Sequence, residues 1–328
     1  MEDPITSLPD GKGGHTSNYA EMHSLTYEDW AQILHRDDMP DLFAWREKYW
    51  TYIPEQPRYE RSRLTGESFP RRLRRCRVTG ATGTDGMRVK EALDLPLVFL
   101  DWLARIFEGV EKGGEWPEPL CYAPTALIPK AGGSDEDGPT KKRPITVACI
   151  WYRVYASIRY QELMSRWAVT WLPPELRGGV PHGECADVSM ELGLEIEYSL
   201  LSDTDLFGAQ LDESKAYDSV VRDLPFQTAV RLGLEEDFVD SQARFYRSLL
   251  RYFKLGDSTG PVFGTGLSIR QGCALSQIWM AITVAAWVWF LREECPEVRV
   301  EGFVDLSLIH ISEPTRPERI AVGGVWVE

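Results

Sequence analysis

Residues Ile278 to Leu291 form an apolar run that is interrupted only by Thr283. Other parts of the chain have to cover such a segment, because each Å² of apolar surface left in water costs about 25 cal/mol. At about 14 residues, the run is shorter than the roughly 20 that a helix needs to cross a bilayer. We therefore expect a buried helix that begins near Leu275.

Local sequence signals predict the other elements. Apolar residues at helical spacing, together with capping and stop residues, predict helices over 41–52, 94–109, 151–167, 186–200 and 224–232. Apolar segments bounded by turn residues predict strands over 126–128, 141–145, 206–211 and 299–305, and a hairpin over 251–263. No internal repeat of 20–50 residues is visible, so a solenoid or propeller is not expected.

The 328-residue chain carries 36 basic and 50 acidic side chains, a net charge of −14. This total argues against a simple nucleic-acid coating protein, which would be basic. The charge is uneven, however: residues 1–60 are acidic, whereas residues 61–90 hold nine Lys or Arg against two acids. Such a run is either a solvated face or flexible basic arm, or a contact to a phosphate backbone. The candidate contacts are Arg71, Arg72, Arg74, Arg75 and Arg77.

The six cysteines are scattered, without a CxxC pair or a Cys/His spacing typical of zinc sites. The N-terminus is acidic and has no apolar segment of the kind that secretory signals contain. These features predict an intracellular protein with reduced thiols, no disulfide partner and no membrane attachment. They do not distinguish the nucleus from the cytoplasm.

Two predicted strands each end on an aspartate, Asp212 and Asp305, and a glycine turn followed by the apolar helix lies between them. Aspartates at strand ends are commonly turn residues or helix caps. The other interpretation is a divalent-metal site, because Mg²⁺ takes hard oxygen ligands and usually only one or two carboxylates. Two such ions can stabilise the attacking and leaving oxygens of phosphoryl transfer.

Several short segments resemble the sequence motifs of one family. The sequence LDESKAYDSV at 211–220, GLSIRQGCALS at 266–276 and FVD at 303–305 resemble the three catalytic motifs of reverse transcriptases of non-LTR (LINE-type) retroelements. Upstream, GTDG at 83–86, LIPK at 127–130 and RPI at 143–145 resemble the finger motifs of that family. Six segments occur in the family's order, and the resemblance covers about residues 80–305.

The resemblance implies an α+β fold with the fingers and palm of a right-hand polymerase. The palm would be a small antiparallel sheet backed by helices, with Asp212 on one strand and Asp305 on a neighbouring strand. The expected regions are an acidic N-terminal extension (1–60), a basic arm (61–79), a fingers-like region partly interleaved with the palm (80–205), the palm (206–305) and a tail (306–328).

The resemblance also implies roles for single residues in RNA-directed DNA synthesis. Asp212 and Asp305, with the Glu213 backbone carbonyl, would hold Mg²⁺ or Mn²⁺. A bulky ring at Tyr217 would lie beneath the incoming sugar and favour dNTPs over ribonucleotides; its other interpretation is a core aromatic. The remaining implied contacts, to the triphosphate, the nucleotide and the template, are Lys130, Arg143, Gln271 and Gly272. The partners would be an RNA template, a DNA primer and dNTPs.

The family pattern breaks after Asp305, where Leu306 stands in place of a second aspartate. Cys273 and Gln277 are further departures, of a kind that the family tolerates. From Leu306 the sequence LSLIHISEPTRPER resembles a translated sequencing-adapter read-through, so we interpret 306–328 as a non-native tail. The chain would then be cut within the third motif and would lack a thumb. Because one metal-binding carboxylate is missing, we expect the chain as written to be inactive or nearly so.

Three other interpretations are considered. The chain could be a catalytically dead nucleic-acid-binding module derived from such an enzyme, or a relative of group II intron reverse transcriptases. The sequence KAYDSV at 215–220 favours the LINE-type family over the intron type. An unrelated Mg²⁺-dependent hydrolase would explain the two aspartates but not the ordered finger motifs.

Overall fold

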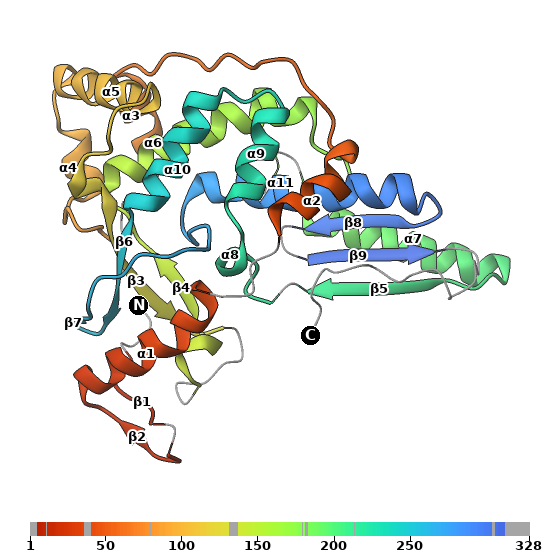
Figure 1. The fold of residues 1–328 in the computed structure, drawn as a ribbon, viewed down its shortest axis with the longest axis horizontal. Coiled ribbons are helices and arrows are strands. Elements are labelled where there is room, and N and C mark those ends of the chain that lie inside the picture. The colour runs from red at the N-terminus through yellow and green to blue at the C-terminus, as the bar shows by residue number, and fades with distance from the viewer. Residues whose placement is uncertain are drawn as a thin grey trace.

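A computed structural model describes residues 5–10, 12–35, 41–78, 80–130, 137–178, 180, 183–212, 214–303 and 306–311, with backbone only for Asp212 and for 306–311. The fold is α+β, as expected: helices surround two separate sheets, and a short two-stranded ribbon, β1 (Leu8–Pro9) with β2 (His15–Thr16), lies near the N-terminus (Figure 1).

The first sheet has four strands in the order β4-β3-β6-β7. Strand β3 (Tyr122–Ile128) pairs antiparallel with β4 (Arg143–Thr146), which confirms the predicted strand–loop–strand unit. On its other edge β3 pairs in parallel with β6 (Leu250–Leu255), which forms a hairpin with β7 (Ser258–Thr259). The predicted 251–263 hairpin therefore extends a sheet that begins more than 100 residues earlier.

The second sheet is antiparallel and has the order β5-β9-β8. Its strands are β5 (Phe207–Asp212), β9 (Leu306–Ile311) and β8 (Arg299–Phe303). Strand β9 comes from the segment that we interpreted as a non-native tail, yet it lies in the middle of the sheet. The strand expected to lead to Asp305, β8, is consequently not the neighbour of β5 (Figure 1).

The apolar run forms α11 (Ala274–Glu294), a helix at the centre of the main hydrophobic core. It packs against α6 (Ile150–Glu162) and α9 (Asp223–Arg231), two of the predicted helices. By length and composition, α11 is the one helix among the described residues that matches a membrane span, but 67% of its apolar window is buried inside the protein. The prediction of a buried helix is confirmed.

The N-terminal region contains more structure than expected. A predicted helix appears as α2 (Leu42–Tyr49) followed by a 3₁₀ turn over 50–52, but α1 (Tyr19–Leu34) was not predicted. Helix α1 packs beside β6 and builds a second small core in which Trp30 and Leu34 join Leu127 and Phe253. The acidic extension is thus attached to the four-stranded sheet.

Helices α3 (Ser68–Leu73), α4 (Val89–Leu93) and α5 (Leu97–Glu111) lie on the side of the main core away from the second sheet (Figure 1). Our placement of a helix start at Asp94 was wrong, because Asp94 ends α4 and Pro96 precedes α5. Helix α5 also continues past Gly109 to Glu111, since Val110 is buried in the core. The remaining α-helices of the described residues are α7 (Cys185–Ser202), which was predicted, and α8 (Ala216–Ser219) and α10 (Glu236–Ser248), which were not. Short 3₁₀ helices cover Glu118–Cys121, Pro139–Lys141 and Ala168–Thr170, and a π-helical turn, Leu163–Trp167, continues α6 to the predicted end at Trp167.

A buried ionic network ties these elements together. Glu111 of α5 is 3% exposed and accepts hydrogen bonds from Nε and Nη2 of Arg159, both at 2.7 Å. It also accepts from Arg61 Nη1 at 2.5 Å and from the Tyr155 hydroxyl at 2.7 Å. Arg159 further contacts Glu162 at 2.7 Å. Arg61 also pairs with Glu235 at 2.6 Å, so three carboxylates and two guanidinium groups form one largely buried network.

Candidate functional site

Strand β5 carries the first motif and ends at Asp212, whose Cα is in register with that of Leu306 on β9. Leu306 is also in register with Phe303, the last residue of β8. Glu213, Asp305 and the side chain of Asp212 lie outside the described residues, so the predicted ligand set stays a prediction. Within the described residues, no three His, Cys, Asp or Glu side chains form a metal-binding group.

The first and second motifs form one unit, although about 50 residues separate them. The backbone N–H of Ile269 donates to the Tyr217 carbonyl at 2.8 Å, and that of Ser268 donates to the Val220 carbonyl at 3.0 Å. Gln271 Nε2 donates to Asp218 Oδ2 at 2.7 Å. These bonds fix the segment that carries Gln271 directly against α8.

Asp218 is the buried acid of this unit, with 1% of its surface exposed. Burial raises the pKa of its carboxyl to about 6, against the lowering effects of Arg251, Lys215 and the hydrogen bond from Gln271. An ionised carboxylate only accepts hydrogen bonds, so it holds the Gln271 amide with its nitrogen toward Asp218 and its oxygen away from it. Asp218 thereby fixes the orientation of the Gln271 amide.

Two buried arginines brace the loop before Gln271. Arg251 Nη2 donates to the Ser268 hydroxyl at 2.8 Å, and Arg222 Nη2 donates to the Leu267 carbonyl at 2.6 Å. Burial, with the nearby charge of Arg270, lowers the pKa of Arg251 to about 10, although Asp218 opposes this shift. The loop is therefore held by charged side chains from β6 and from the start of α9.

Gly272 follows Gln271 and adopts a φ of +100°, a conformation that side chains with a Cβ rarely adopt. A Cβ built at this position would lie 2.9 Å from the Thr146 carbonyl oxygen. The Thr146 N–H in turn donates to the Gln271 carbonyl at 3.0 Å. The second motif thus packs directly on β4, one of the two strands of the predicted finger hairpin.

Lys130 and Arg143 flank that hairpin and are both exposed. Arg143 is in register with Ile128, two residues before Lys130, so the sequence placed both cations at the same end of the hairpin correctly. Lys215 of the first motif also reaches this hairpin, and its ammonium group donates to the Thr140 carbonyl. Burial lowers the pKa of Lys215, and the charge of Lys130 lowers it further.

Lys215 also lies 4.5 Å from the ring centroid of Trp30, a cation–π contact with α1. Tyr217, two residues further along the chain, is half-buried at the beginning of α8 and packs against the main core. Both interpretations of Tyr217, a platform beneath a sugar and a core aromatic, fit this position. Its role beside a nucleotide stays a prediction.

The arginine-rich segment lies on and after α3. Arg71, Arg74, Arg75 and Arg77 are exposed, which suits contacts to a phosphate backbone. Arg72 differs, because its Nε donates to the Ser157 hydroxyl on α6 at 2.6 Å. Four of the five predicted contacts therefore face solvent, and the fifth anchors the segment to the core.

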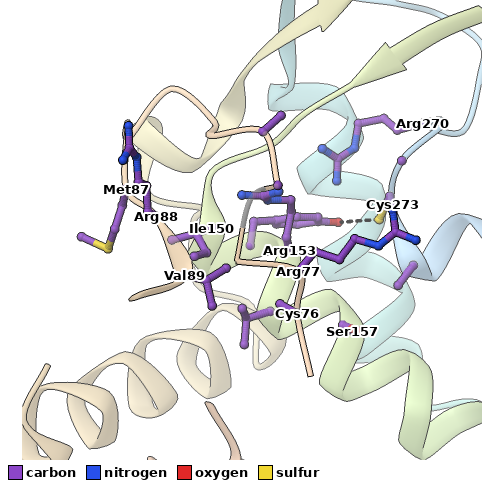
Figure 2. Close-up of a pocket in the computed structure, with 16 residues that line it drawn as sticks. Cys76, Arg77, Met87, Arg88, Val89, Ile150, Arg153, Ser157, Arg270 and Cys273 are labelled. Atoms are coloured by element: carbon purple, nitrogen blue, oxygen red, sulfur yellow. Dashed lines mark hydrogen bonds between the residues drawn. The ribbon is translucent and has the colours of Figure 1, made fainter. Parts of the chain in front are cut away.

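Sequence reasoning missed two features of this region. Asp85 of the GTDG segment accepts the Ile150 N–H at 2.7 Å through Oδ2 and so holds the beginning of α6. Next to it lies a cavity of about 290 Å³ whose lining includes Arg88, Arg153 and Arg270 (Figure 2). These arginines are far apart in the sequence, and only Arg270 belongs to a recognised motif.

The chain is similar in sequence to a known retroelement protein. No family model matches the chain. Over 232 residues it is 27% identical to the "Retrovirus-related Pol polyprotein from type-2 retrotransposable element R2DM" of Drosophila melanogaster. The match covers 71% of this chain and 20% of that polyprotein, so the chain matches about a fifth of its relative's length. The chain is therefore a distant homologue of the Pol polyprotein of an R2 non-LTR retrotransposon.

Proposed function

We propose that this chain is the fingers and palm of a non-LTR reverse transcriptase, built to bind an RNA template with a DNA primer and to add dNTPs to the primer 3′-hydroxyl. The single observation that carries the proposal is the joining of three motif segments. The second motif donates to the Tyr217 and Val220 carbonyls of the first and accepts from Thr146 of the finger hairpin. The distant homology to a retrotransposon Pol polyprotein supports the same assignment.

In this assignment the β3–β4 hairpin belongs to the fingers and the β5-β9-β8 sheet to the palm. Strands β6 and β7 lie within 206–305 but join the hairpin in one sheet. Lys130 and Arg143 bind the triphosphate of the incoming nucleotide, because both cations stand exposed at one end of the hairpin. Gln271 contacts the nucleotide through its amide oxygen, and Gly272 lets the backbone approach closely. Tyr217 lies beneath the sugar. Catalysis then consists mainly of alignment and charge stabilisation.

Carboxylate oxygens of Asp212 and Asp305, with the Glu213 carbonyl, form a hard-oxygen donor set that suits Mg²⁺ or Mn²⁺. When bound, these ions stabilise charge on the attacking and leaving oxygens. In the sequence, Leu306 stands where the family's pattern has a second aspartate after Asp305, and its Cα is in register with that of Asp212. We therefore propose that the chain as written binds template and primer but adds almost no dNTP.

A second candidate function is a nucleic-acid-binding module without catalysis, which Leu306 favours directly. Two assays on the 328-residue protein test the proposal: anisotropy of a labelled RNA-template/DNA-primer duplex, and primer extension with Mg²⁺ or Mn²⁺. We expect salt-dependent binding with little or no extension. Absence of binding would refute the proposed function, and robust dNTP incorporation would refute the inactivating role of Leu306.

A further inference from the structure

The cavity of about 290 Å³ lies where residues 76–89 meet the beginnings of α6 and α11 (Figure 2). Arg88 and Met87 lie at one end of it, and Arg270 and Cys273 lie at the other (Figure 2). Of the predicted site residues, only Arg77 and Gly272 line it. The cavity is therefore largely separate from Lys130 and Arg143, the predicted triphosphate residues.

The lining contains four arginines, Arg77, Arg88, Arg153 and Arg270, and no acidic residue. Arg270 is 1% exposed, and its guanidinium group lies over the rings of Tyr152 and Phe245, at 4.5 and 4.9 Å from their centroids. The buried Nε atoms of Arg153 and Arg270 have no hydrogen-bond partner among the described residues. Leaving such buried donors unpaired is unfavourable, so the cavity is suited to an acceptor with negative charge.

Two helices add to this positive potential. Ile150 and Ala274, the first residues of α6 and α11, both line the cavity. A helix N-terminus carries a partial positive charge and favours anions. The N–H of Ile150, the first residue of α6, already donates to Asp85, but Asp85 is not part of the lining.

The lining also includes the apolar side chains of Met87, Val89, Ile150 and Val154. The volume lies near the lower end of the range for small-molecule sites, about 300–1,000 Å³. A ligand that matches both the cationic and the apolar lining residues has a phosphate group and a flat, weakly polar ring. The exposed arginines 71, 74, 75 and 77 lead along the chain to this cavity, as expected for a groove that follows a strand backbone.

We propose that the cavity binds one nucleotide of a single-stranded nucleic acid. Its phosphate contacts Arg77, Arg153 and Arg270, and its base packs against Met87, Val89 and Ile150. The proposal rests on the proposed function only in requiring that the chain bind nucleic acid. The same phosphate chemistry is present in free nucleotides, but the arginine segment beside the cavity favours a strand.

The test is fluorescence anisotropy of a labelled single-stranded RNA between 50 and about 300 mM salt, with a labelled DNA strand of the same sequence in parallel. Arg77→Ala/Arg153→Ala removes two of the proposed phosphate contacts, and Met87→Glu places a negative charge among the apolar lining residues at a half-buried position. Arg105→Ala is the matched control, because Arg105 is exposed on α5 outside the cavity. Thermal melting shows whether each variant is folded.

We expect the double variant and Met87→Glu to weaken binding by at least 10-fold, and Arg105→Ala to change it by less than about 2-fold. Loss of two phosphate contacts lowers the salt slope by about 1.4. If wild type binds no strand, the proposed function fails. If wild type binds and the folded cavity variants match the control, only the cavity assignment fails. If millimolar ATP displaces the labelled strand, the ligand of the cavity is a free nucleotide and the proposal of a bound strand is wrong.

Discussion

Gln271 donates a 2.7 Å hydrogen bond from its side-chain amide to Asp218, a carboxylate that is almost fully buried. The contact joins the turn before α11 to the short helix that follows β5. It gives Gln271 one defined amide orientation, and it does so with an acid whose ionisation is unfavourable where it stands. The site therefore gains order at a cost in stability.

That cost predicts the pH dependence of the variant Asp218→Asn. The folded-state pKa of about 6 exceeds the unfolded value of 3.8, so between pH 4 and 6 the folded protein binds more protons than the unfolded one. Wild-type stability should fall as pH rises through this window, and the variant should lack that fall. We expect Asp218→Asn to be about 2 kcal/mol more stable than wild type at pH 8 and nearly equal at pH 4. Urea unfolding at the two pH values measures this; a pH-independent difference would contradict it.

Gly272 is predicted to tolerate no side chain. Gly272→Ala places a Cβ at a positive φ, which costs about 1–2 kcal/mol, and brings it 2.9 Å from a carbonyl oxygen. We expect a loss of at least 2 kcal/mol in urea unfolding and weaker template–primer binding. Gly109→Ala is the control, because Gly109 lies inside α5 with no atom within 4 Å of a built Cβ. This control should gain about 1 kcal/mol, and equal losses in both variants would rule out the backbone argument.

The buried network around Glu111 is predicted to dominate local stability. Glu111→Gln removes the carboxylate that Arg159 and Arg61 share, although Glu162 and Glu235 still contact them, and we expect a loss of about 3 kcal/mol. Arg63→Ala breaks an ion pair whose arginine is 77% exposed, and it should change stability by less than about 1 kcal/mol. Differential scanning fluorimetry and urea unfolding report both values. Similar melting temperatures for the two variants would show that the network contributes little.

The arginine segment is predicted to divide into binding and anchoring residues. Arg71→Ala/Arg74→Ala/Arg75→Ala should lower the salt slope of nucleic-acid binding by about 2 and leave the melting temperature unchanged, since all three side chains are exposed. Arg72→Ala should instead lower the melting temperature, because it loses the hydrogen bond to Ser157. A triple variant with unchanged salt slope would remove the segment from the interface.

Patterns within single segments of the sequence predicted several helices and strands. The apolar run became α11, and the end of β5 at Asp212 followed from a short apolar strand. Two missed helices also had usable signals. Met22, Thr26, Trp30 and Leu34 repeat every four residues in α1, and Phe238, Val239, Gln242, Phe245 and Tyr246 mark one face of α10. Buried polar residues such as Thr26 and Gln242 hid this spacing.

The pairing of strands that lie far apart along the chain could not be predicted from the sequence. Nothing local indicates that β3 pairs in parallel with β6, or that β9 separates β5 from β8. The cavity arginines come from three segments that only the folded chain brings together. By contrast, the placement of Lys130 and Arg143 at one end of the hairpin was predictable, because an antiparallel pair brings the end of its first strand next to the beginning of its second.

The most direct test of the central claim is single-nucleotide addition by Leu306→Asp, at protein concentrations that saturate an RNA-template/DNA-primer duplex. Restoring a carboxylate next to Asp305 should allow dNTP addition with Mg²⁺ or Mn²⁺. Wild type and Asp212→Asn/Leu306→Asp, assayed at equal duplex occupancy, should add almost none. If Leu306→Asp binds the duplex and still adds no nucleotide, the chain is a binding module and the polymerase assignment is contradicted.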